Sequence, residues 1–340
     1  MKKLSILLLT CVLIIGALSG CASSESDSGS SNKLVIYSPN SEEIIKTIIP
    51  MFEKQTGITV ELVTAGTGEI IKRLQSEKQN PYADVMFGGS MAGFRENEAL
   101  YEPYVSPEDK NLMEGHRNTS GFATPYISDG SVLLVNKNLI GDIKIEGYAD
   151  LLNPQLKGKI ASADPASSSS AFAQLTNMLK AMGGDYESEQ GWNYVGQLIE
   201  NLDGKIASGS GAVHKSVADG EYVVGLTYED PSSTYVKNGA PVEIVYPKEG
   251  AVFLDAGSAI IKDAPHMDNA KKFIDFILSQ EAQDAFGTQL TNRPLRQGTK
   301  LGDHMKPYEE IHMIDEDTDY VSAHKSEIVE RYVDLFTSVK

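Results

Sequence analysis

The chain is poor in cysteine. Its 340 residues contain two, Cys11 and Cys21. Cys11 lies in an N-terminal apolar run of the kind that is removed from secreted proteins, so the mature chain keeps a single thiol. A single thiol excludes an intramolecular disulfide and a cysteine-ligated zinc, and nothing in the sequence indicates a catalytic thiol.

Positive charge is also scarce. The sequence has 30 Lys and Arg against 47 Asp and Glu, a net charge of −17, and removal of residues 1–20 takes away two lysines and leaves −19. A surface this acidic argues against nucleic acid and against adhesion to anionic lipid. It does not exclude a small anionic ligand, because backbone dipoles inside a cleft act over short distances.

Long apolar runs are confined to the N-terminus. Lys2 and Lys3 precede the apolar run Leu4–Leu18, which has signal-peptide length. The run ends Leu-Ser-Gly-Cys, which resembles a lipobox, where the chain is cut before the Cys and its thiol is acylated. We therefore expect a lipoprotein signal peptide at 1–20 and a lipid such as palmitate on Cys21.

The segment after Cys21 is rich in serine and has no apolar periodicity, so residues 21–32 are expected to be a flexible tether. A lipid anchor and a tether would hold the body at the extracellular face of the membrane, or on the periplasmic side if the cell has an outer membrane. No later stretch is apolar enough to cross a bilayer.

The first third of the body alternates between strand and helix patterns, which predicts a parallel sheet. Polar, glycine-bearing loops follow the strands, where ligand groups gather in such folds. The expected strands are Leu34–Tyr37, Ile58–Val63 and Asp84–Phe87, the helices are 43–56, Glu69–Glu77 and Ala92–Ala99, and the loops are Ser38–Asn40, Ala65–Gly68 and Gly88–Ser90. Asn40 with Glu43 suggests a capping box, and Pro50 should kink the first helix.

A run of four serines, Ser167–Ser170, follows Pro165 and precedes a helical pattern that includes Phe172, Leu175 and Met178. A helix that begins among serines presents unpaired N–H groups and hydroxyls at its positive end, so it can bind an anion without lysine. The simpler alternative is a solvated N-cap.

The rest of the chain predicts a second lobe and a return to the first. The expected elements are strands at Ser131–Val135, Val223–Tyr228, Pro241–Tyr246 and Val252–Ile261, a helix over Gln190–Leu202 with Trp192 in the core, a short helix starting at His214, a long helix within Pro265–Phe286 and helical packing over 300–340. Two crossings predict an α/β protein with a hinge: 33–125 and 254–300 as lobe 1, 126–253 as lobe 2, and 301–340 as a C-terminal helical segment.

Six segments together resemble the solute-binding proteins of ABC importers, in the type II branch that includes ferric-ion and hexose-phosphate binders. They are Phe52–Ile58, Leu151–Ile160, Ala259–Lys262, Asn269–Ile274, Ser279–Gln283 and Asn292–Leu295. The resemblance implies a two-lobed type II periplasmic-binding-protein fold with the ligand between the lobes. It also implies partners in a permease and an ATPase, a monomeric state, and neither enzymatic activity nor a cofactor.

The resemblance also bears on the ligand. Ferric binders hold iron with two adjacent tyrosines, and here the matching pair is Tyr228 and Glu229, which disfavours iron. In hexose-phosphate binders an acid and a preceding histidine contact sugar hydroxyls, a role implied for Glu229 and His214. Ser38 and the serines after Pro165 would then hold the phosphate. We expect a sugar phosphate or phosphonate, with ferric ion as the alternative.

The candidate ligand-binding residues all lie at strand ends or helix starts. They are Ser38, Pro39, Asn40, Thr67, Gly68, Gly89, Ser90, Tyr126, Ser167, Ser168, Ser169, His214, Lys215, Tyr228 and Glu229. Each also has a structural alternative: Glu229 as a surface partner of Lys215, and Tyr126 as core. Tyr37, Arg293 and Asp255 are weaker candidates with the same ambiguity.

An extracellular hydrolase is a more distant alternative. Gly88–Ala92 approaches a nucleophile elbow around Ser90, and His214 with Asp230 could complete a triad, but the final glycine of that motif is missing. Gly66 and Gly68 supply two of the three glycines of a dinucleotide loop, and Ile71 replaces the third, so a nucleotide role is weaker still.

Overall fold

A computed structural model describes residues 32–207 and 209–338. The expected signal peptide, the acylation of Cys21 and nearly all of the expected tether lie outside the described residues. Within the described ranges, no helix is both long enough and apolar enough to span a membrane.

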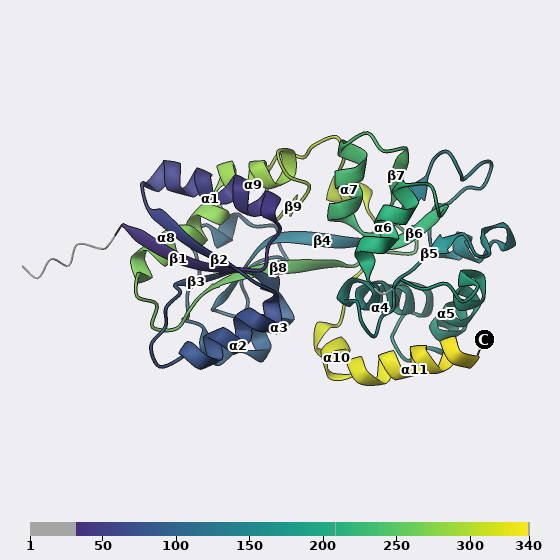
Figure 1. Cartoon of the computed structure of the whole chain (residues 1–340), viewed down its shortest axis with the longest axis horizontal. Coiled ribbons are helices and arrows are strands. Elements are labelled where there is room, and N and C mark those ends of the chain that lie inside the picture. Colours follow the sequence, from purple (N-terminus) through teal and green to yellow (C-terminus); the bar gives the residue numbers. More distant parts are fainter. Residues whose placement is uncertain (1–31, 208, 339–340) are drawn as a thin grey trace, which may run out of the picture.

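One sheet joins two lobes (Figure 1). Its strand order is β2-β1-β3-β8-β4-β6-β5, and β7 and β9 also pair with β4. Its strands are β1 (Lys33–Ser38), β2 (Thr59–Thr64), β3 (Val85–Ser90), β4 (Ala123–Asn136), β5 (Ile160–Ala161), β6 (Val224–Tyr228), β7 (Val242–Val245), β8 (Phe253–Ile260) and β9 (Arg293–Pro294). The expectation of a parallel sheet was right for β1 with β2 and β3, but β8 runs antiparallel to β3 and β4, so the sheet is mixed.

Strands β4 and β8 carry the chain between the lobes (Figure 1). The first part of β4 pairs with β8, and from Ser131 onward β4 pairs with β6. The change of partner falls at Gly130, where an added Cβ would lie 2.5 Å from the ring of Phe253. A side chain at this position would collide with the Phe253 ring, so glycine lets this ring pack against the crossing strand.

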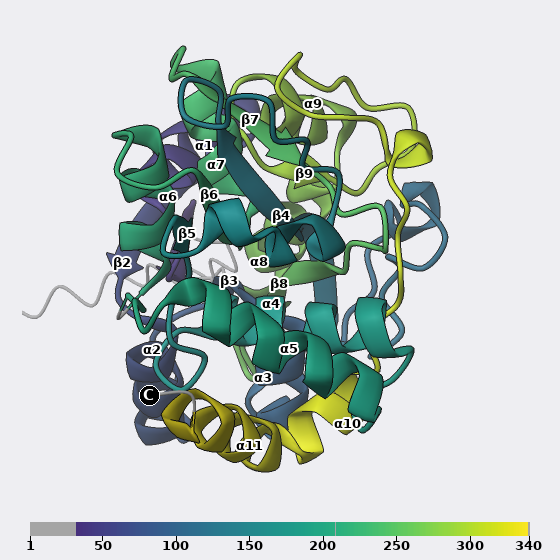
Figure 2. The same cartoon turned by 90° about the vertical axis from the view of Figure 1, so that its right-hand side faces the viewer.

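The helices cover both sides of each half of the sheet (Figures 1 and 2). They are α1 (Glu42–Thr56), α2 (Thr67–Glu77), α3 (Met91–Glu96), α4 (Ser169–Gly183), α5 (Glu189–Leu202), α6 (Ser210–Ala218), α7 (Glu229–Lys237), α8 (Met267–Ile277), α9 (Gln280–Thr288), α10 (Thr318–Ala323) and α11 (Lys325–Ser338). We call the half with α1–α3, α8 and α9 lobe 1, and the half with α4–α7 lobe 2. Each lobe has its own apolar clusters, centred on residues such as Phe52 and Phe273 in lobe 1 and Leu175 and Trp192 in lobe 2.

The start of α1 differs from the expected capping box. Ser41 is the N-cap, and its side chain accepts the N–H of Ile44, so Asn40 is left for another role. The helix continues through Pro50 to Thr56, and Gly57 ends it in the left-handed conformation. Burial of Ile48 and Phe52 on either side of Pro50 stabilises the helix enough to tolerate the proline.

Two other helix boundaries were wrong. The long helix expected within Pro265–Phe286 is two helices, α8 and α9, because the side chain of Ser279 accepts the N–H of Ala282 and starts a new helix. The helix expected to start at His214 begins four residues earlier, at Ser210.

The C-terminal segment packs on lobe 2, with α11 lying beneath α5 (Figure 2). Ile328 and Tyr332 are buried against the lobe 2 core, and the guanidinium of Arg331 lies 4.5 Å from the centre of the Trp192 ring. Trp192 is 3% exposed, which confirms its expected place in the core.

Candidate functional site

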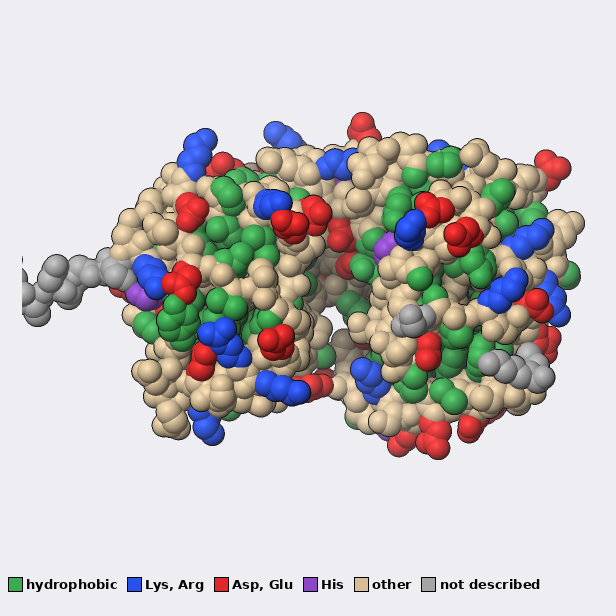
Figure 3. Space-filling model, in the orientation of Figure 1, with side chains coloured by type: hydrophobic (Ala, Val, Ile, Leu, Met, Phe, Trp, Pro, Cys, Tyr) green, Lys and Arg blue, Asp and Glu red, His purple; other side chains and the backbone are tan. Residues whose placement is uncertain are grey.

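A cavity of about 640 Å³ lies where the two lobes meet at the crossing strands. The space-filling view shows the opening between the lobes (Figure 3). Lobe 2 supplies most of its walls, from the starts of α4 and α6. The lining is Ser90, Asp129, Gly130, Ser131, Ser167, Ser168, Ser169, Ser170, Ala173, Gly209, Ser210, Gly211, Tyr228 and Leu254.

The serine run Ser167–Ser170 forms one wall of the cavity. Ser168 is the N-cap of α4, and its hydroxyl accepts the N–H of Ala171 at 3.3 Å. The hydroxyls of Ser168 and Ser170 lie 3.1 Å apart. Only one serine is needed to cap the helix, so Ser169 and Ser170 bring further hydroxyls to the cavity.

A second helix begins at the same cavity. The N-cap of α6 is Gly209, which has no side chain to bind the first N–H groups of the helix. The first turn of α6, at Ser210 and Gly211, lines the cavity beside the serine wall. Sequence reasoning placed this helix start at His214, although the small residues Gly209–Gly211 are typical of an N-terminus.

The positive ends of α4 and α6 therefore face one space. Each helix end is equivalent to a fraction of a positive charge, and its free N–H groups are donors for an anion. The described lining contains no Lys or Arg. An anion bound here would be held by backbone dipoles and hydroxyls.

Lobe 1 contributes Ser90. It is the N-cap of α3, and its hydroxyl accepts the N–H of Gly93 at 3.2 Å. The preceding Gly89 has a φ of 127°, a conformation that side chains disfavour, so glycine fixes the turn that aims Ser90 at the cavity. Of these two candidates, the structure places Ser90 at the cavity and Gly89 behind it.

Asp129 is a cavity residue that sequence reasoning missed. It lies on β4 immediately before Gly130, and its carboxylate accepts the N–H of Asp230 at 3.1 Å. Burial raises the pKa of Asp129 well above its usual value, and the nearby Asp230 and Glu229 raise it further. Asp129 lies where the sequence predicted a crossing between the lobes, and no local pattern marked it as a ligand contact.

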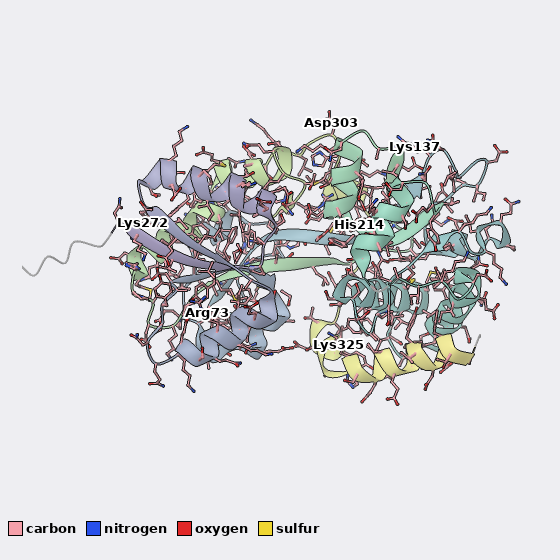
Figure 4. All side chains as sticks on the ribbon, in the orientation of Figure 1. Arg73, Lys137, His214, Lys272, Asp303 and Lys325 are labelled. Atoms are coloured by element: carbon pink, nitrogen blue, oxygen red, sulfur yellow. The ribbon has the colours of Figure 1, made fainter. Side chains whose placement is uncertain are left out.

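Tyr228 lines the cavity, whereas His214 lies just outside it. The ring of His214 is centred 6.2 Å from that of Tyr228 and 5.8 Å from that of Tyr235, and Nδ1 is 3.4 Å from the Thr227 hydroxyl. Figure 4 shows His214 on the side of lobe 2 that faces the space between the lobes. Burial lowers its pKa, which favours the neutral ring.

Glu229 does not reach the cavity. Its side chain is 1% exposed, accepts a 2.8 Å hydrogen bond from Nε of Arg293, and is also bound by the second guanidinium nitrogen and by the Tyr246 hydroxyl. The expected contact with ligand hydroxyls is therefore not supported, because the carboxylate is already saturated. Arg293, also a weak ligand candidate, is occupied in the same ion pair.

Lys215 points to a different part of lobe 2. Its ammonium pairs with Asp219 on the same helix, and it lines a separate surface groove with Ser216 and Tyr222. It is neither a cavity residue nor the partner of Glu229, because α6 directs positions 210 and 215 to different sides.

Ser38, Asn40 and Tyr126 form a hydrogen-bonded network in lobe 1, in which Asn40 is half-buried. The Tyr126 hydroxyl donates to Oδ1 of Asn40 at 2.9 Å, and Nδ2 of Asn40 and the Ser38 hydroxyl both donate to the Phe87 carbonyl, at 3.0 and 2.6 Å. These side chains order the loop after β1, and they do not line the cavity. Pro39, between them, is likewise outside its lining.

The remaining candidates also lie elsewhere. Thr67 and Gly68 are exposed in the first turn of α2. The Tyr37 hydroxyl donates to Glu77, and Asp255 lies within 2.9 Å of Nδ1 of His116. Each of these groups therefore has a local structural role.

The residues suggested for a hydrolase do not assemble. Ser90 caps α3, His214 contacts Thr227, and Asp230 accepts a hydrogen bond from the Thr291 hydroxyl. A triad requires these groups to bind one another in sequence, and they have other partners. In the described ranges, no group of three or more His, Cys, Asp or Glu side chains is arranged to hold a metal ion.

A family model described as bacterial extracellular solute-binding protein matches residues 34–289. The chain belongs to this family. It is a solute-binding protein of an ABC importer, and its fold is the type II periplasmic-binding-protein fold. Proteins of this family act outside the cytoplasm and work with the permease and ATPase subunits of the importer. The family consists of binding proteins, which is consistent with the dispersed triad.

Three relatives of this solute-binding protein differ in their ligands. The periplasmic binding protein AfuA from Actinobacillus pleuropneumoniae, solved with fructose-6-phosphate, is 25% identical, with a TM-score of 0.73 over 90% of this chain and 98% of that one. A Salmonella typhimurium protein named for binding 2-aminoethylphosphonate is 25% identical over 75% of each chain. Iron uptake protein A1 from Synechocystis is 24% identical over 83% of this chain and 82% of its own.

Proposed function

We propose that this solute-binding protein captures a small phosphorylated organic anion, a sugar phosphate or a phosphonate, and delivers it to its permease. The observation that carries the proposal is the meeting of α4 and α6 at one cavity lined by serines. Phosphate and phosphonate oxygens accept several hydrogen bonds at once, and two helix ends offer several donors in a small volume.

The cavity supports this ligand better than ferric ion. Iron binders of this type use phenolate pairs, and the lining has one tyrosine, Tyr228. Burial raises the pKa of Tyr228, and the nearby Asp129 and Asp230 add to the shift, so the phenolate form is disfavoured. AfuA with fructose-6-phosphate and the phosphonate-binding relative support the proposal further.

We also propose the arrangement around this activity. The two lobes would close about β4 and β8 when the ligand binds, and the closed form would be the one that the permease recognises. A lipid on Cys21 would hold the protein, as a monomer without catalytic activity, at the outer face of the membrane.

A binding screen tests the proposal. The purified full-length protein would be titrated calorimetrically with fructose-6-phosphate, 2-aminoethylphosphonate, inorganic phosphate and ferric citrate. We expect an organic phosphate or phosphonate to bind most tightly and to be recovered intact. Tight binding of ferric ion with a visible charge-transfer band, or release of phosphate from the ligand, would overturn it.

A further inference from the structure

The C-terminal segment makes a third crossing between the lobes. On the lobe 1 side, the N–H of Gly302 donates to the carbonyl of Gly287 in α9 at 2.8 Å. On the lobe 2 side, the carbonyl of His312 accepts the N–H of Ala251, just before β8, at 2.9 Å. Between these points the ring of Tyr308 packs on that of Phe253 in β8, with centres 5.3 Å apart. Residues 303–311 therefore cross beside β8, in addition to the two crossings that the sequence predicted.

After this crossing the chain is anchored on lobe 2. The Thr176 hydroxyl of α4 donates to the carboxylate of Glu316 at 2.9 Å, and the N–H of Asp317 donates to the Tyr186 hydroxyl at 2.9 Å. The ring of Tyr320 in α10 stacks on that of Tyr186, with centres 5.3 Å apart. These contacts attach α10 to lobe 2, so a movement of the lobes carries α10 with α4 and α5.

From this anchor α10 reaches across to lobe 1. The guanidinium of Arg95 in α3 donates to the Thr318 hydroxyl at 3.3 Å and lies 3.7 Å from the carboxylate of Asp319. One turn along α10, the Ser322 hydroxyl donates to the carboxylate of Glu96 at 3.4 Å. Figure 1 shows α3 and α10 facing each other below the crossing strands.

The contacts between α3 and α10 enclose the outer part of the cleft. A cavity of about 550 Å³ lies between the start of α3 and residues 313–325, and it shares Ser90 and Leu254 with the cavity that the serine run lines. In Figure 3 the opening between the lobes is bounded above by the crossing and below by a second contact of the lobes. The lobes are therefore joined on both sides of this opening.

We propose that the C-terminal segment is an interlobe clasp, in which α10 binds α3 and keeps the ligand-free lobes part-closed. The inference goes beyond the proposed function, because it concerns the protein without ligand and holds whatever the ligand is. The clasp is reversible: an exposed ion pair of this kind changes an equilibrium by up to about fivefold. It therefore biases the distance between the lobes without locking them, and it releases when the lobes move apart to admit a ligand.

A reciprocal exchange of charge tests the clasp. Arg95→Glu sets a carboxylate against Asp319, and Asp319→Arg sets a guanidinium against Arg95; the two side chains are 43% and 95% exposed, so the cores of both lobes should stay intact. X-ray scattering of the ligand-free, full-length protein should show a larger radius of gyration in each single variant. The double variant restores the pair in reverse and should return to the wild-type radius.

Lys144→Glu is the matched control. It makes the same change of charge as Arg95→Glu and breaks an exposed pair with Glu146, but it lines neither cavity. Its radius of gyration should equal that of the wild type. Circular dichroism of every variant would confirm that the fold is retained, and Asp319→Arg carries the test if Arg95→Glu does not fold.

The outcomes are independent of the proposed function, because no ligand is added. An unchanged radius in both single variants would overturn the clasp, and so would an increase that the double variant does not reverse. Either result would leave an organic phosphate or phosphonate as the proposed ligand. Conversely, a failure of every phosphorus oxyanion to bind would leave the clasp standing.

Discussion

Arg293 and Glu229 form an ion pair that is buried from solvent, with side chains 0% and 1% exposed. Arg293 lies on β9, which pairs with β4 at the crossing, and Glu229 is the first residue of α7 in lobe 2. The guanidinium also lies 4.6 Å from the centre of the Tyr308 ring and 5.2 Å from that of Phe253. The ion pair therefore joins β9 to the first turn of α7 in lobe 2.

Removal of Arg293 should destabilise the protein strongly. Arg293→Met would leave Glu229 buried without its cation, which typically costs about 3–5 kcal/mol. Urea unfolding followed by circular dichroism measures the change. Lys215→Met, which breaks an exposed pair with Asp219, is the control and should cost less than about 1 kcal/mol. A loss below about 1 kcal/mol for Arg293→Met would show that the pair is dispensable.

A negative charge at the start of α4 should separate stability from binding. Ser169→Asp places a carboxylate at a helix N-terminus, which favours folding by about 0.3–1 kcal/mol. The same carboxylate would repel an anionic ligand, so affinity should fall at least tenfold. Ser188→Asp, at the N-cap of α5 outside the cavity, is the matched control and should leave affinity unchanged. Retained phosphonate binding in Ser169→Asp would place the anion elsewhere.

Tyr126 should matter for stability and not for binding. Tyr126→Phe removes the hydroxyl that donates to Asn40, and a net loss of about 1 kcal/mol is expected. Calorimetric affinity for the phosphonate should stay within about twofold of the wild type, since the residue is outside the cavity. A large loss of affinity with unchanged stability would restore Tyr126 as a ligand contact.

Burial of His214 should contribute a loss of stability in mild acid. Its pKa is lowered from 6.5 in the folded state, so below pH 6.5 the unfolded chain takes up a proton that the folded chain resists. The contribution of His214 to stability should therefore fall as the pH drops below 6.5, whereas that of Asp129, whose folded pKa is raised, changes in the opposite direction. The groups facing His214 are Thr227, Tyr228 and Tyr235, none of them a carboxylate. His214→Gln should reduce the slope between pH 7 and pH 5, and an unchanged slope would assign it to other groups.

Ligand binding should compact the protein. The lobes are joined by β4 and β8, and on the other side of the cleft Arg95 of α3 reaches Thr318 at 3.3 Å and Asp319 at 3.7 Å. X-ray scattering should show a smaller radius of gyration at saturating phosphonate than without it. Arg95→Ala removes these two exposed contacts, so the free energy of unfolding should change by less than about 1 kcal/mol. An unchanged radius at saturation would contradict closure.

Part of this fold could be predicted from local patterns. The apolar faces of α1, α4, α5 and α11 repeat at helical spacing, and the strands of lobe 1 alternate with helices in chain order. The helix start at Ser168 followed from the serines that cap it. Boundaries such as the break at Ser279 were missed, because one capping hydroxyl decides between one long helix and two.

Contacts between residues far apart in the sequence determined which of the charged residues lie at the cavity. Glu229 and Arg293 are 64 residues apart, and no local pattern indicates that each is the other's partner. Asp129 became a cavity residue only because β4 changes its partner strand at the next position. Asn40 and Tyr126 are 86 residues apart and bind each other in lobe 1, so neither side chain lines the cavity.

The sequence pattern by itself indicated a two-lobed α/β protein with a serine-capped helix available for an anion, and the binding role came from the resemblance to a known family. Those features arise from periodicity, capping and turn chemistry, which act between neighbours in the chain. The tertiary structure alone decided that α6 joins α4 at the cavity, that Asp129 lines this cavity, and that Glu229 is withdrawn into a buried ion pair. Charge interactions depend on distance in space, and only the folded chain sets those distances.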